Sequence, residues 1–279
     1  MGRKASGFAV ALGLTAAFVV AAPVAATATD LGKAGGFSYA KATEKVAANK
    51  TSGTVFAKCP GETESLGGGS SLSRDADGIY VSESSGRDPD GWFTSAHHEP
   101  GPGFKVTSWV ICAKGEGVKR YRDNATAGEG NPFYHSVSCE QGYPVSGGNH
   151  TQGPVENWVL SQIWPFSASG WATTVANFGP TADLTAEVTC IEAGTYNSMI
   201  ETYSSNASID EHALGCDNGQ SVMGGGTVSD GFGDETHILE SRPIDGLADN
   251  DKVPDDGWRA TNYNDANETR NYEIYASCR

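Results

Sequence analysis

Three stretches of the sequence follow one pattern: "CPGETESLGGG" at residues 59–69, "CEQGYPVSGGN" at residues 139–149 and "CDNGQSVMGGG" at residues 216–226. In each stretch a glycine stands eight residues after the cysteine, and a Gly-Trp pair and a second cysteine follow. These later landmarks are Gly91-Trp92 and Cys112, Gly170-Trp171 and Cys190, and Gly257-Trp258 and Cys278. Four landmarks in a constant order and at nearly constant spacing indicate a chain built from three homologous copies.

The repeated glycines are interpreted as architectural. A phosphate-binding glycine loop occurs once, after a strand, and leads with a Lys-Ser/Thr pair into a helix. Here the glycines recur in every copy, no lysine follows them, and no helical pattern begins there. Glycine within a strand marks a bend or a close approach of another group. We therefore expect the tryptophan of each Gly-Trp pair to lie against a surface that lacks side chains.

The copies have the pattern of short antiparallel strands. In residues 184–190 and 271–278 apolar and polar side chains alternate, which is typical of a half-buried strand and places each closing cysteine inward. The runs that enter the opening cysteines, and the segments before them, predict further strands. The fold class is therefore all-β, with three homologous antiparallel modules. Short connections favour modules packed as a pseudo-threefold β-prism or barrel, and tandem small β-sandwiches are the alternative.

The N-terminus has the features of a secretory signal peptide at residues 1–28. Two basic residues precede an apolar run at 8–22, and the small residues "ATA" at 26–28 form a cleavage site. We therefore expect an exported protein, secreted to the extracellular space. The expected modules, called copy one, copy two and copy three, are residues 29–114, 115–193 and 194–279.

The charge of the chain narrows the class of partner. The formal net charge is -15, and removal of the signal peptide would take away Arg3 and Lys4 and make the charge more negative. An acidic surface repels phosphate backbones and anionic lipids, so nucleic acid and membrane surfaces are excluded as expected partners. No later stretch has the roughly 20 apolar residues that a membrane-spanning helix needs.

The six cysteines all lie in the exported part, and an even number in an oxidising compartment predicts three disulfides. The repeat leaves two regular pairings. Neighbouring copies could be joined, through 112–139, 190–216 and 59–278. We expect instead that each copy closes on itself, because a duplicating unit must carry its own cross-link. The expected pairs are Cys59 with Cys112, Cys139 with Cys190, and Cys216 with Cys278.

The sequence contains few features of a catalytic or metal site. It has no G-x-S-x-G and no H-E-x-x-H motif. His135 and His212 each precede an opening cysteine by four residues, where copy one has Val55, which indicates a half-buried strand position. His97 and His98 are adjacent on a strand and should face opposite sides. We therefore expect no cofactor and lean towards a protein that is not an enzyme.

Calcium is the one metal that the sequence leaves open. The acidic stretches at 74–78, 230–235 and 249–257 resemble fragments of calcium loops. A complete loop needs alternating oxygen ligands that end in a bidentate glutamate. None of the three stretches completes that set, so acidic turns are the preferred interpretation.

The aromatic side chains of copy two are the candidate ligand-binding residues. Trp158, Trp164, Phe166 and Trp171 lie close together in the sequence. An aromatic ring can stack on the apolar face of a sugar while neighbouring polar groups bind its hydroxyls. Trp164 and Phe166 are the better candidates, because they precede the Gly-Trp pair in what we expect to be a connection. Trp158 is the third candidate, with burial in the core as the alternative for it and for Trp171.

Three classes of function remain open. The first is a secreted non-catalytic binding or surface protein whose ligand is a glycan or a cell-wall polymer. The second is an extracellular structural or protein-interaction module, or an inhibitor of exported enzymes, with an extracellular protein as its partner. The third is a hydrolase with an unfamiliar site built from histidine and aspartate.

The layout from residue 59 to 278 resembles tandem modules of exported proteins from high-GC Gram-positive bacteria. The residues that carry this resemblance are the cysteine-glycine openings, the glycine runs, the Gly-Trp pairs and the closing cysteines. The three-copy layout, with "CPG" at residues 59–61, is also loosely similar to the vitelline membrane outer layer protein family. That resemblance implies a β-prism of three sheets built from Greek-key repeats, and sugar binding.

Overall fold

The computed structural model of the chain describes residues 28–73, 78–86, 90–192, 196–231, 233, 235–246, 251–265 and 268–279. The expected signal peptide, apart from Ala28, lies outside these residues. The described part of the chain consists of antiparallel strands joined by turns, with one 3₁₀ turn, η1, at Val155–Asn157. The prediction of an all-β fold is therefore confirmed.

Each copy contributes six strands, and β1 (Thr29–Ala34) precedes them. Copy one forms β2 (Phe37–Val46), β3 (Ser52–Lys58), β4 (Glu64–Leu72), β5 (Ile79–Ser85), β6 (Gly91–His98) and β7 (Phe104–Ala113). Copy two forms β8 (Val118–Ala127), β9 (Pro132–Ser138), β10 (Tyr143–Thr151), β11 (Trp158–Ser167), β12 (Gly170–Asn177) and β13 (Ala182–Ile191). Copy three forms β14 (Asn197–Ser205), β15 (Ile209–Gly215), β16 (Val222–Ser229), β17 (Thr236–Ile244), β18 (Gly257–Asn264) and β19 (Arg270–Cys278).

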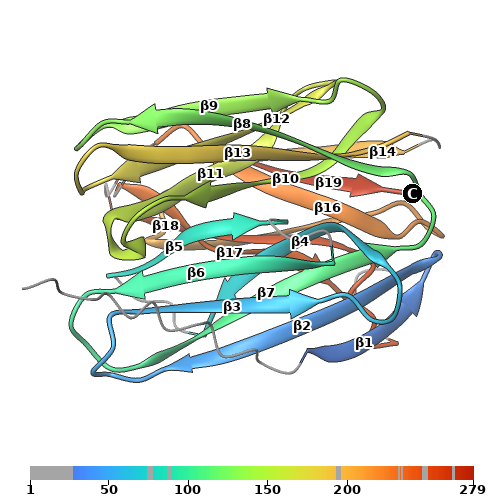
Figure 1. Ribbon diagram of the computed structural model, residues 1–279, viewed down its shortest axis with the longest axis horizontal. Coiled ribbons are helices and arrows are strands. Elements are labelled where there is room, and N and C mark those ends of the chain that lie inside the picture. The colour runs from blue at the N-terminus through green and yellow to red at the C-terminus, as the bar shows by residue number, and fades with distance from the viewer. Residues whose placement is uncertain are drawn as a thin grey trace, which may run out of the picture.

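The strands form three sheets, and every sheet combines two copies (Figure 1). Sheet A has the order β1-β2-β7-β4-β17-β18-β15, sheet B β3-β6-β5-β10-β13-β8, and sheet C β14-β19-β16-β11-β12-β9. In each sheet the first, sixth and third strands of one copy join the fourth, fifth and second strands of another. This cyclic exchange gives the packed, pseudo-threefold arrangement of a β-prism. It excludes three independent sandwiches, and none of the sheets formed by the described strands closes into a barrel.

The three glycine strands meet at the centre of the prism. β4, β10 and β16 contact one another, and each carries a β-bulge at the equivalent position. The bulged residues are Leu66, Val145 and Met223, and all three are fully buried. A bulge bends its strand and re-aims one side chain. Here it turns one apolar side chain from each copy into a shared core.

The three consecutive glycines of copy one have three separate neighbours. A Cβ added at Gly67 would lie 2.3 Å from the carbonyl oxygen of Met223 in copy three. One added at Gly68 would lie 2.4 Å from the Trp92 ring, and one at Gly69 would lie 1.9 Å from the carbonyl oxygen of Ser241. Gly67 therefore allows a central strand of copy three to approach, Gly68 allows the Trp92 ring to pack, and Gly69 allows β17 of copy three to pair closely.

Copy two departs from the simple count of eight residues after the cysteine. By that count Gly147 corresponds to Gly67. In the structure, however, Gly147 corresponds to Gly68, because each of these two glycines lies against the tryptophan of its own copy's Gly-Trp pair, Trp171 or Trp92. The central position of copy two is held by Ser146, whose hydroxyl donates a hydrogen bond of 2.8 Å to the carbonyl oxygen of Leu66. The opening segment of copy two is thus one residue shorter than the others.

The tryptophans of the Gly-Trp pairs form the core behind the glycine strands. Trp92, Trp171 and Trp258 are at most 1% exposed. The indole N–H groups of Trp92 and Trp258 each donate a hydrogen bond of 3.0 Å to a serine, Ser84 and Ser241 respectively. Copy two has Ile163 at the equivalent place, and the Trp171 N–H finds no acceptor among the described residues.

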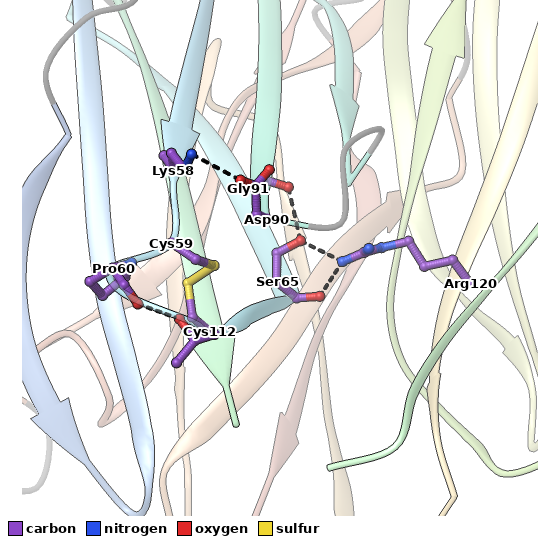
Figure 2. Close-up of a disulfide and its surroundings, with 9 residues drawn as sticks. Lys58, Cys59, Pro60, Ser65, Asp90, Gly91, Cys112 and Arg120 are labelled. Carbon is purple, nitrogen blue, oxygen red and sulfur yellow. Dashed lines mark hydrogen bonds and ion pairs between the residues drawn. A yellow bond between two sulfur atoms is a disulfide. The ribbon is translucent and has the colours of Figure 1, made fainter. Parts of the chain in front are cut away.

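The disulfides confirm the prediction that each copy closes on itself. The bonds are Cys59–Cys112, Cys139–Cys190 and Cys216–Cys278. Figure 2 shows the first bond beside Arg120, which reaches across from copy two. Its guanidinium donates to the carbonyl and hydroxyl oxygens of Ser65. Three disulfides are typical of proteins in an oxidising, extracellular environment.

Candidate functional site

The candidate site lies on the outer face of sheet C. Trp164 and Phe166 alternate along β11 and point to this face; Trp164 is half-buried and Phe166 is 40% exposed. The sequence placed both in a connection, but they belong to the strand, because β11 stays paired with β12 as far as Ser167 and Gly170. The strand tolerates Pro165 because β11 pairs with β16 only at Ile163. The backbone N–H that proline lacks is therefore not needed for a hydrogen bond to β16.

A row of residues crosses sheet C beside Trp164. The pairing of Ile163 with Thr227 places Trp164 opposite Gly226 on β16. Gly226 pairs with Tyr275 on β19, and Tyr275 pairs with Ile200 on β14. A Cβ added at Gly226 would lie 2.0 Å from the carbonyl oxygen of Ile163. The repeated glycine therefore lets β11 approach β16 closely, which places Trp164 of copy two in one row with Tyr275 of copy three.

Two hollows follow each other along this face, and together we call them the sheet C groove. One has a volume of about 330 Å³ and is lined by aromatic and apolar side chains that include Phe166, Tyr196, Ile200 and Tyr275. The other has a volume of about 290 Å³. Its lining residues are Trp164, Thr202, Val228, Ser229, Asp230, Asn271 and Glu273. The hollows are consecutive because their lining residues occupy successive positions on the same strands, β11, β14 and β19.

The polar side of the groove consists of hydrogen-bond acceptors held in place. The Asn271 amide donates a hydrogen bond of 2.8 Å to Asp230 and accepts one of 2.6 Å from Ser204. The Tyr275 hydroxyl donates to a carboxylate oxygen of Glu273. Burial, with the neighbouring Glu273 charge, raises the pKa of Tyr275 above its usual value, so the phenol stays neutral.

Further aromatic rings extend the groove at both ends. Tyr134 is 50% exposed, and its ring centroid lies 5.7 Å from that of Trp164. At the other end the ring centroids of Tyr143 and Tyr196 lie 5.6 Å apart. None of the residues that line the two hollows carries a positive charge. The site therefore combines ring faces with fixed acceptors, which suits a ligand rich in hydroxyl groups.

Trp158 is not available to a ligand, and its assignment as a binding residue is wrong. It is 1% exposed, and its indole N–H donates a hydrogen bond of 3.1 Å to the carbonyl oxygen of Gln152. Its side chain belongs to the main hydrophobic cluster. Trp171 lies in the same cluster, as expected.

Tyr196, Ile200, Glu273 and Tyr275 were missed by the sequence reasoning. A signal was present for the last two. The closing strand at 271–278 places Tyr272, Ile274, Ala276 and Cys278 inward, and all four are buried. The residues between them must point to the outer face of sheet C, which identifies Glu273 and Tyr275, although only 8% of Tyr275 is exposed. Ile200 comes from β14, the leading strand of copy three, and Tyr196 directly precedes that strand. The sequence does not place this strand beside copy two.

The histidines take separate positions. His135 and His212 are half-buried on β9 and β15, as expected from the repeat, each 3.4 Å from an aspartate. His97 and His98 border one cavity, although they are adjacent on β6. Among the described residues no group of three or more His, Cys, Asp or Glu side chains is placed to hold a metal ion. The acidic stretches that resemble calcium loops lie partly outside the described residues.

A scan against protein-family models and a search of curated proteins found no match to this chain. In the described part of the chain, no helix has the length and apolar character to cross a membrane.

Proposed function

We propose that the protein is a secreted, non-catalytic binding protein whose ligand is a glycan or a cell-wall polymer. The observation that carries this proposal is the sheet C groove, in which Trp164, Phe166 and Tyr275 lie beside Asp230 and Glu273. A sugar chain offers apolar ring faces that stack on aromatic side chains, and hydroxyl groups that donate to carboxylates. The groove is long enough to contact more than one sugar unit, since it spans two consecutive hollows.

The charges of the groove favour a neutral glycan. Its lining carries Asp230 and Glu273 and no basic side chain. A uronate or phosphate group would be repelled there, whereas neutral hydroxyl groups would be bound. Each carboxylate is already engaged by a fixed neighbour, Asn271 or Tyr275. This arrangement suits positioning of a ligand, and it supports binding in preference to hydrolysis.

A glycan array that includes neutral oligosaccharides and cell-wall preparations tests the proposal. We expect binding by the native protein and weaker binding by Trp164→Ala and Phe166→Ala, with unfolding unchanged. Phe93→Ala is the matched control, because Phe93 is a half-buried ring on sheet B that pairs with Phe56 at 4.4 Å. If the native protein binds no glycan on the array, glycan binding is rejected and an extracellular protein-interaction module is favoured.

A further inference from the structure

A second cavity lies where copy one meets copy two, away from the sheet C groove. Its volume is about 390 Å³, and it shares no lining residue with the groove. Copy one lines it with Tyr80, His97, His98 and Glu99, and copy two adds Glu156 and Phe178. This volume is within the range of sites for small molecules, roughly 300–1,000 Å³.

The walls of this cavity are largely aromatic. Tyr80 stacks on His97 with ring centroids 5.0 Å apart, and His98 packs edge-on against Phe104 at 5.1 Å. Phe178 is 47% exposed and belongs to the part of the lining that copy two supplies. Aromatic rings offer their electron-rich faces to a cation.

The hydrogen bonds around His97 leave it as an acceptor. The Ser82 hydroxyl donates its one proton to the carbonyl oxygen of Val155 at 2.8 Å. Its oxygen therefore accepts the bond of 2.9 Å from Nδ1 of His97, which leaves Nε2 of His97 without a proton. Burial, together with the neighbouring His98, lowers the pKa of His97 to about 4, so the ring is neutral at physiological pH.

His98 is fixed in the opposite way. Its Nε2 lies 2.6 Å from the carbonyl oxygen of Lys50. A carbonyl oxygen only accepts, so Nε2 of His98 donates this hydrogen bond.

The charged groups of the lining are both negative. Glu99 and Glu156 are exposed, and neither carboxylate forms an ion pair with a described residue. Among the residues that the structure describes, no lysine or arginine side chain lines the cavity. A ligand with a positive charge would therefore gain from two carboxylates and from the aromatic faces, whereas an anion would be repelled.

We propose that this cavity binds a small organic ammonium ion. The cation would lie against the exposed ring of Phe178, with Glu99 and Glu156 compensating its charge, while the Tyr80 ring is held between His97 and His237. This proposal is independent of the sheet C groove, because the two sites share no residue.

The test uses choline chloride as the probe and 3,3-dimethyl-1-butanol as its uncharged isostere. Binding to the native protein is measured from amide chemical shifts, which also report where the probe binds. We expect saturable choline binding with a Kd on the order of 1 mM, typical of so small a ligand. The shifts should be centred on Thr51, Glu99 and Glu156, and the isostere should bind about five-fold more weakly or worse.

Two variants and one control sharpen this test. The double variant Glu99→Gln/Glu156→Gln should weaken choline binding about five-fold or more. Phe178→Ala should weaken it about three-fold, and its exposed position predicts a folded protein. Glu62→Gln is the control, since Glu62 is also exposed but lies beyond the opposite end of β3 from Thr51.

The proposal is overturned if choline produces no saturable shifts in the folded native protein. It is also overturned if choline and its isostere bind equally well, because the cavity would then be merely apolar. A loss in Glu62→Gln as large as in the double variant would assign the effect to overall charge and reject the site. Trp164→Ala should bind choline like the native protein, because the two sites share no residue. The choline proposal can therefore be tested even if the protein binds no glycan.

Discussion

The outer faces of sheets B and C have the same backbone plan and different surfaces. In both, a repeated glycine, Gly148 or Gly226, lies in the middle of the sheet beside a residue of a closing strand. In sheet B that residue is Glu187, which is 2% exposed and bound by Arg122 at 2.7 Å and by the Gly86 N–H at 2.8 Å. In sheet C it is Tyr275, which lines an open groove.

Sheet A provides a third version of the same position. Trp109 stands there, with the Lys41 ammonium 4.6 Å and the Arg242 guanidinium 4.8 Å from its ring centroid. Cations therefore cover the ring in sheet A, and an ion pair fills the position in sheet B. Sheet C has an open groove at this position, bordered by the half-buried Trp164 and by Tyr275, which is 8% exposed. Residues that are common to the copies build the prism, and the outward residues that differ between copies are free to bind ligands.

The largest effect that we predict separates two neighbouring tryptophans of copy two. Trp171→Ala should lower the free energy of unfolding by about 3 to 5 kcal/mol, because it empties a core position over Gly147. Trp164→Ala should change it by less than about 0.5 kcal/mol, as expected for a surface residue. Urea unfolding of both variants measures the difference. The reverse order would show that inner and outer faces of sheet C are wrongly assigned.

The next largest effect is a loss of folding stability at low pH, which we assign to His97 at the end of sheet B. The folded-state pKa of His97 is about 4, below the usual value of 6.5. Its contribution to stability is therefore complete above pH 6.5 and is lost as the pH falls towards 4. The native protein should lose about 2 kcal/mol more than His97→Gln between pH 7 and pH 4.5.

Urea unfolding of native protein and His97→Gln at both pH values provides the measurement. Asp255 has a pKa raised to about 6, mainly by burial, so its own contribution falls as the pH rises through 6. That opposite trend is common to both proteins and cancels in their difference. Equal losses in the two proteins would contradict the buried, neutral state of His97.

A smaller effect compares the equivalent faces of sheets B and C directly. Glu187→Gln should lower the free energy of unfolding by about 1 to 2 kcal/mol, because the largely buried Arg120 and the partly exposed Arg122 lose their partner. Glu273→Gln on sheet C should have almost no effect on stability. Thermal unfolding of the two variants is the check, and a larger loss in Glu273→Gln would mean that the groove is structural.

Much of the fold could be predicted from the sequence, because its main features are local. The alternation in 184–190 and 271–278 identified strands, and the repeat identified the disulfide pairs. The exchange of strands between copies leaves no periodic signal, since it depends on close approaches such as that of Gly69 to Ser241. The one-residue shortening of copy two could not be predicted either. Ser146 takes the central position that a glycine holds in the other copies, and the two glycines after it hide the offset.

The candidate site was predictable in part. Trp164 and Phe166 stood out because copy one has no aromatic residue there. Trp158 was misassigned because alternation shows which residues share a face but not which face is covered. The other half of the groove comes from copy three, and only the pairing of β11 with β16 brings Tyr275 beside Trp164.

The most direct measurement titrates the best neutral glycan of the array into native protein, Trp164→Ala and Phe93→Ala by calorimetry. Loss of one stacking ring removes about 1 kcal/mol, so Trp164→Ala should bind about five-fold more weakly. Phe93→Ala on sheet B should bind like the native protein. Equal affinities for native protein and Trp164→Ala, or a loss confined to Phe93→Ala, would contradict the assignment of the glycan site to sheet C.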